Sequence, residues 1–86
     1  MKIFKYVIPF TQSQFVTMPV GAQVLSTGAQ NGDIVVWAKV NPDAQTTARH
    51  FLIYGTGWEF DNLDRYRYLG TVQIEGFVLH IFMENV

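Results

Sequence analysis

Arginines interleaved with aromatic residues are the feature of this sequence best suited to binding chemistry. The set comprises Arg49, Tyr54, Trp58, Arg65, Tyr66, Arg67 and Tyr68. A guanidinium group binds phosphate through two parallel hydrogen bonds, and an aromatic face stacks on a nucleobase. The pattern therefore predicts a site for a small anionic, nucleotide-like ligand. Its candidate residues are Arg49, Arg67, Trp58, Arg65, Tyr68 and Lys39, the last offering only a point charge.

The spacing of Arg65 and Arg67 predicts that both side chains lie on one face of a strand, with the neighbouring tyrosines on the other face. Arg49 begins another predicted strand, directly after a connecting segment. The alternative interpretation is an ordinary amphipathic strand whose arginines pair with Asp61 or Asp64. Surface charges of that kind are usually just a solvated face.

No arrangement of residues indicates catalysis. Ser13 and Ser26 both lack the Gly-x-Ser-x-Gly context of a nucleophile elbow. His50 and His80 are distant in the sequence and have no cysteine near them, which makes a poor metal-ligand set. We therefore expect no catalytic residue, no metal site and no cofactor, and we predict that the protein is not an enzyme.

Two further motifs have simpler interpretations. The acidic stretch Trp58–Asp64 lacks the alternating ligands and the central glycine of a calcium loop, so we interpret it as a solvated surface loop. The segment Gly55-Thr56-Gly57 follows a predicted strand, as phosphate-binding loops do. It lacks the lysine and the following helix of such loops. We interpret it as a turn that places Trp58 on the surface.

These candidate residues must be positioned by a fold that is organised around the segment Ala22–Val40. Asn31-Gly32 divides this segment into two apolar arms, and Asn-Gly is the strongest short-range signal of a hairpin. A type I′ turn needs positive φ at both central positions, which asparagine tolerates and glycine adopts freely. The second arm holds the β-branched and aromatic run Ile34–Trp37, which favours a strand.

The other segments with strand character lie on both sides of this hairpin. They are Lys2–Ile8, Phe15–Met18, Arg49–Gly55, Arg65–Glu75, and Phe77–Met83. Gly70 inside the fourth of these indicates a bulge or a close backbone approach. Ala44–Ala48 reads as a loop or a single helical turn. The sequence therefore predicts a single all-β domain over residues 1–86, a small antiparallel sheet or barrel-like domain of six or seven short strands with little helix.

The composition restricts the predicted cellular location and binding partners of this domain. The net charge of −1 gives no general attraction to nucleic acid, and no apolar run is long enough to span a bilayer. Lys5 interrupts what would be the apolar region of a signal peptide, so export is not expected and a cytoplasmic location is. The absence of cysteines removes disulfides as a stabilising device, and we therefore expect a homo-oligomer.

Four motifs resemble those of a family of small, uncharacterised phage and prophage proteins. They are Phe4-Lys5-Tyr6-x-Ile8-Pro9, Asn31-Gly32 followed by Trp37-Ala38-x-Val40-Asn41-Pro42, Phe51-x-Ile53-x-Gly55-Thr56-Gly57, and Tyr68-x-Gly70-Thr71-Val72-Gln73. The likeness spans most of the chain, and none of the motifs is a catalytic signature. The resemblance implies a phage context and transfers no functional residue. Together with the cytoplasmic location expected above, it places the predicted protein in the cytoplasm of the host cell.

Two binding functions remain open. In the first, an oligomer acts as a sponge that sequesters a nucleotide-like immune signal and so inhibits host antiviral defence. In the second, the protein is an interaction module that inhibits a host protein or serves as a phage structural accessory, with aromatic residues as hot spots. Arginines from neighbouring protomers that converge on one concave pocket would favour the first function. A flat aromatic patch with dispersed arginines would favour the second.

Overall fold

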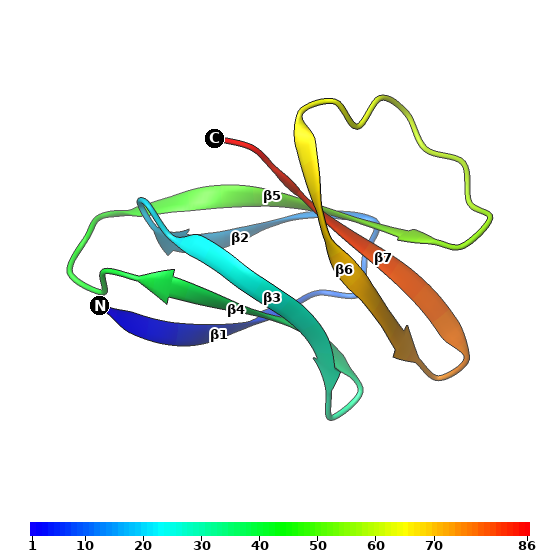
Figure 1. The fold of residues 1–86 in the computed structure, drawn as a ribbon, viewed down its shortest axis with the longest axis horizontal. Coiled ribbons are helices and arrows are strands. Elements are labelled where there is room, and N and C mark those ends of the chain that lie inside the picture. Colours follow the sequence, from blue (N-terminus) through cyan, green and yellow to red (C-terminus); the bar gives the residue numbers. More distant parts are fainter.

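The chain forms seven β-strands and no helix in a computed structural model that describes residues 1–86 (Figure 1). The strands are β1 (Lys2–Ile8), β2 (Ser13–Pro19), β3 (Gln23–Gln30), β4 (Asp33–Val40), β5 (Thr46–Gly55), β6 (Tyr66–Ile74) and β7 (Phe77–Glu84). All neighbouring strands pair antiparallel, in two sheets with the orders β1-β4-β3 and β2-β5-β7-β6. The predicted all-β antiparallel fold is confirmed, with two sheets in place of a closed barrel.

The predicted hairpin is formed by β3 and β4. Asn31 and Gly32 have φ values of 54° and 80°, the positive values that a type I′ turn requires. A second turn of the same kind joins β6 to β7, with φ values of 49° at Glu75 and 86° at Gly76. The strand β4 pairs on both sides and is buried along most of its length, which accounts for its run of β-branched residues.

The core fills the space between the two sheets. It is built by the inward-facing residues of each strand, because alternate side chains of a strand point to opposite faces. Phe51, Leu79 and Ile81 of the four-stranded sheet are fully buried there, as are Val36 and Ala38 of the three-stranded sheet. The opposite faces of both sheets are more exposed, although Val35 on the outer side of β4 is also buried, at 1% exposure.

The two sheets approach each other closely where β3 lies beside β6 (Figure 1). The pairing of β6 with β7 shifts between Tyr68 and Gly70, which confirms the predicted bulge at Gly70. A Cβ atom at Gly70 would lie 2.8 Å from Cγ2 of Thr27 on β3, so only glycine allows this approach. A second shift, between Val24 and Ser26, was not predicted.

Two predicted boundaries were wrong. The segment Ala44–Ala48 was expected as a loop or helical turn, but Thr46–Ala48 begins β5 and pairs with Thr17–Pro19. The β-branched residues Thr46 and Thr47 favour a strand once a partner strand is present, and that partner is distant in the sequence. The strand β2 is accordingly longer than Phe15–Met18, and it tolerates Pro19 because it lies at the edge of its sheet.

Candidate anion site

Arg49 is the one charged residue that the structure buries. It lies on β5 in the alternating series that also turns Phe51 and Ile53 inward, and only 5% of its surface is exposed. A charge taken out of water is costly unless it is paired or hydrogen-bonded. The partners of the Arg49 guanidinium therefore decide whether its role is structural or functional.

The guanidinium of Arg49 is only partly satisfied. Nη1 donates to the carbonyl oxygen of Ala22 at 3.1 Å, and Nη2 donates to Sδ of Met83 at 3.6 Å. Nε is buried and has no hydrogen-bond partner. Burial lowers the pKa of Arg49, and the nearby positive charge of Arg67 lowers it further. Neither recorded hydrogen-bond partner is a carboxylate, so the positive charge is not neutralised by its bonds.

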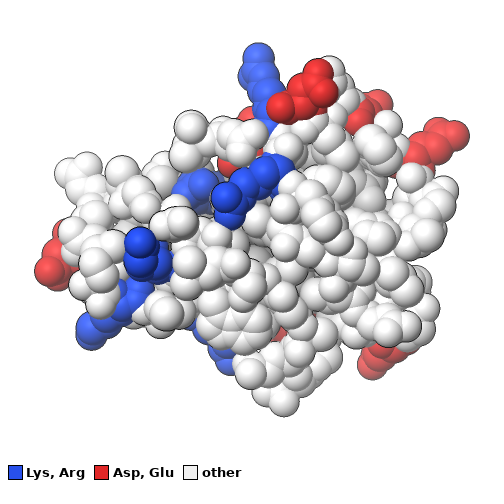
Figure 2. All heavy atoms as spheres, viewed as in Figure 1, with Lys and Arg blue, Asp and Glu red and all other residues white.

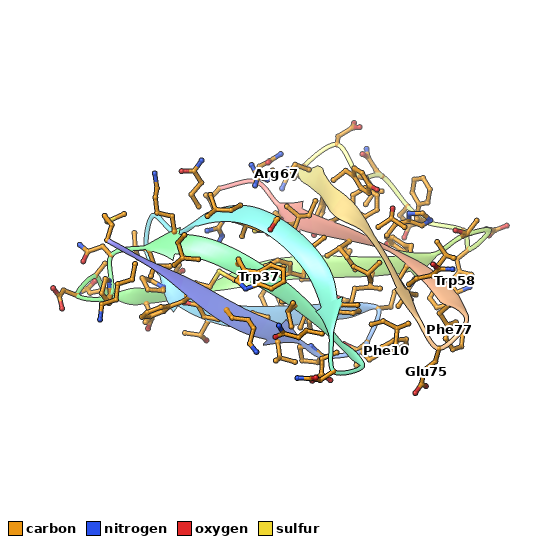
Figure 3. The ribbon with its side chains drawn as sticks, turned by 60° about the horizontal axis from the view of Figure 1, so that its bottom comes forward. Phe10, Trp37, Trp58, Arg67, Glu75 and Phe77 are labelled. Atoms are coloured by element: carbon orange, nitrogen blue, oxygen red, sulfur yellow. The ribbon has the colours of Figure 1, made fainter.

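Arg67 lies near Arg49 on the strand β6, which is separated from β5 in the sheet by β7. It lies on β6 directly opposite Met83 of β7, and its Nη2 donates to the carbonyl oxygen of Val24 at 2.8 Å. Figure 3 shows Arg67 near the beginning of β6, at the other end of this strand from the turn that carries Glu75. Two guanidinium groups thus flank Met83 where the two sheets meet.

These two arginines line a pocket of about 210 Å³, which we call the arginine pocket. Its lining residues are Ala22, Gln23, Val24, Arg49, Arg67, Met83, Asn85 and Val86. No aspartate or glutamate side chain is among them. A pocket that holds two guanidinium groups and no acidic side chain is suited to a small anion, because each arginine retains N–H donors that its present bonds do not use.

The other predicted site residues lie elsewhere. Trp58 follows the far end of β5, about 20 Å from Arg49 at ~3.3 Å per strand residue. Tyr68 lies on the outer face of the four-stranded sheet, opposite Phe82, and Lys39 is exposed on β4. Arg65 precedes β6, so it does not share a strand face with Arg67 as predicted. The structure therefore joins Arg49 and Arg67 and separates both from the aromatic candidates.

A hydrogen-bonded serine and histidine were missed by the sequence reasoning. Oγ of Ser13 lies 2.7 Å from Nε2 of His50, and the hydroxyl of Tyr66 lies 2.6 Å from Nδ1 of the same ring. Only the pairing of β2 with β5 brings Ser13 near His50, and no local signal announces it. The third member is a phenol where a catalytic triad has a carboxylate. Ser13 and His50 also line none of the pockets.

One family of proteins matches the whole chain. Residues 1–86 match the model of a domain of unknown function (DUF7352). Searches of curated proteins and of solved structures gave no match. The structure contains no group of three or more acidic or histidine side chains that could hold a metal ion, and no helix of the length and apolarity needed to cross a bilayer.

Proposed function

Because the chain belongs to the DUF7352 family, a domain of unknown function, we infer its role from its own site. We propose that the protein binds a phosphate-bearing anion in the arginine pocket. The observation that carries this proposal is the buried guanidinium of Arg49, whose Nε has no partner and whose hydrogen bonds go to a carbonyl and a thioether. An unsatisfied buried donor costs about 1–3 kcal/mol. A bound anion would accept hydrogen bonds from N–H donors of the two arginines that line the pocket, and it would offset the repulsion between Arg49 and Arg67.

The proposed ligand is the phosphate group of a nucleotide-like molecule, held without chemical change. In this proposal the protein is an oligomeric sponge of a phage, which lowers the free concentration of a host immune signal. The separation of Trp58 and Tyr68 from the arginine pocket adds a constraint. An aromatic residue that stacks on the nucleobase would have to come from a neighbouring protomer, which makes oligomerisation part of the binding mechanism.

The experiment is calorimetry with pyrophosphate, a panel of cyclic nucleotides and ADP-ribose derivatives. Arg67→Ala is the informative variant, because Arg67 is exposed and its removal leaves the core intact. Hydrogen bonds to charged groups contribute about 1.5–3 kcal/mol, so the affinity should fall by about ten- to a hundredfold. Arg65→Ala is the matched control, since it removes the same charge two residues away and outside the pocket. Absence of binding by the wild type at tens of micromolar would refute the proposal.

A second candidate function is favoured by the outer face of the four-stranded sheet. Large aromatic side chains are exposed there, including Phe15 at 66% and Tyr68 at 56%. Exposed aromatic clusters are typical of protein interaction sites. If no anion binds, an interaction module that uses this face becomes the better proposal, and Phe15→Ala should then weaken capture of a host protein while Arg67→Ala does not.

A further inference from the structure

A second pocket, lined by aromatic rings, lies beyond the end of β5 and shares no residue with the arginine pocket. Its volume is about 240 Å³, and we call it the aromatic pocket. Its lining residues are Tyr54, Gly55, Thr56, Gly57, Trp58, Phe60, His80 and Phe82. Four of the eight are large aromatic residues. Figure 3 shows Trp58 at this end of the structure, well separated from Arg67.

The turn after β5 builds this pocket. Gly57 has a φ of 87°, and the amide of Trp58 donates to the carbonyl oxygen of Gly55 at 3.0 Å, so the chain folds back at once. The Trp58 ring then packs on Gly55, where a Cβ atom would lie 2.6 Å from Cε2 of the indole. The glycines of the motif thus serve to place the tryptophan.

The rings of Tyr54, Phe60 and Phe82 line the rest of the pocket, with their planes tilted relative to one another. The ring centroids of Tyr54 and Phe82, on the neighbouring strands β5 and β7, lie 6.2 Å apart with the planes at 66°. Phe60 lies 5.6 Å from Tyr54 with the planes at 46°. Phe60 and Trp58 are 61% and 47% exposed, so part of the surface of these two rings is accessible at the pocket. The negative electrostatic potential of aromatic faces attracts cations.

Acidic side chains border the same aromatic pair. Glu59 and Asp61 line an adjoining hollow of about 150 Å³ that shares Tyr54 and Phe60 with the aromatic pocket. No lysine or arginine lines either space. Figure 2 shows acidic groups gathered at the end of the molecule where the β5–β6 loop lies in Figure 1. The charge at this pocket is therefore opposite to that of the arginine pocket.

Histidine at the pocket wall does not supply a competing anion site. Nε2 of His80 lies 2.7 Å from Oγ1 of Thr56, and Nδ1 lies 2.9 Å from Oγ1 of Thr71. Both ring nitrogens thus have hydroxyl hydrogen-bond partners, and neither is free to bond to a ligand.

We infer that the aromatic pocket binds a small quaternary ammonium compound. A methylated ammonium ion is weakly hydrated and presents only methyl groups, so it loses little on entering a space with few hydrogen-bonding groups, and it gains from the surrounding π-faces. The carboxylates of Glu59 and Asp61 favour the positive charge over a neutral molecule of the same shape. The volume is below that of ordinary drug-sized sites, which matches one head group and not an extended peptide.

The test is a titration with choline and with its neutral carbon isostere, 3,3-dimethylbutan-1-ol, followed by amide NMR shifts of the residues around the pocket. We expect choline to bind about tenfold more tightly than the isostere, a difference that equals ~1.4 kcal/mol. Equal affinities would overturn the proposal and leave only an apolar hollow. Absence of choline binding at tens of millimolar would also overturn it.

Variants locate the binding. Phe60 is 61% exposed, so Phe60→Leu should leave the fold intact and weaken choline binding several-fold. Phe15→Leu, at an equally exposed aromatic outside the pocket, should have no effect. Asp61→Asn should reduce the preference for choline over the isostere, whereas the remote Glu75→Gln should not. Unchanged affinity in Phe60→Leu, or tighter binding of a trimethyllysine peptide than of choline, would overturn the assignment.

Discussion

Replacing Arg49 by methionine separates a binding role of this residue from a structural one. Arg49→Met removes the unpartnered Nε donor, whose burial costs about 1–3 kcal/mol, together with the repulsion from Arg67. It also removes the bond to the Ala22 carbonyl, and hydrogen bonds to charged groups contribute about 1.5–3 kcal/mol. The two terms nearly cancel. We therefore expect the free energy of unfolding to stay within about 1 kcal/mol of the wild-type value.

Urea unfolding, followed by tryptophan fluorescence, measures this difference as a shift of the midpoint at unchanged slope. The same experiment with a phosphate ligand at 100 times its wild-type Kd should stabilise the wild type by about 2.7 kcal/mol. Arg49→Met keeps only Arg67 in the pocket, so a ten- to hundredfold weaker affinity should reduce this gain to about 0.4–1.4 kcal/mol. Arg65→Met is the control and should respond to the ligand as the wild type does. A loss of ~3 kcal/mol or more in Arg49→Met without ligand would refute the reasoning, because that is the cost of breaking a satisfied buried ion pair.

Three further outcomes are expected. Gly32→Val should destabilise the fold by at least ~1 kcal/mol in urea unfolding, because a β-branched residue is strained at the φ of 80° found there; a neutral result would exclude a strained turn. Gly70→Ala should lower the free energy of unfolding by about 1–3 kcal/mol, since the new Cβ would lie 2.8 Å from the Thr27 methyl group. Adding Thr27→Ser removes that methyl group and keeps the hydrogen bond to the Val35 carbonyl, so it should restore part of the lost stability. Light scattering at micromolar concentration should give a dimer or larger species, and a monomer would remove the proposed role of a neighbouring protomer.

Local sequence signals were sufficient for the turns and for most strands. Asn31-Gly32 determines its own backbone conformation, and the bulge at Gly70 follows from a glycine inside a strand pattern. The β5 residues Thr46–Ala48 carried no such local signal. Their strand conformation depends on pairing with β2, more than twenty residues earlier in the chain.

The arginine pocket illustrates what sequence alone does not contain. Arg49 and Arg67 were identified by residue type, but their meeting depends on the strand order β5-β7-β6, which places β7 between them. Trp58 was a candidate for the same site, and it is close to Arg67 in the sequence. The strand β5 instead carries the chain to the other end of the molecule before Trp58 is reached, so proximity along the chain was misleading.

The arginine pocket also lies where hydrogen bonds connect the two sheets. Arg49 and Arg67 both project from the four-stranded sheet, and each donates a hydrogen bond to a carbonyl at the start of the three-stranded sheet, on Ala22 and Val24. These two hydrogen bonds connect the sheets along one edge of the sandwich. An anion bound to the unused N–H groups of both arginines would hold the two side chains in their present positions. Amide hydrogen exchange along β3 should then slow on binding, although β3 supplies no charge to the ligand.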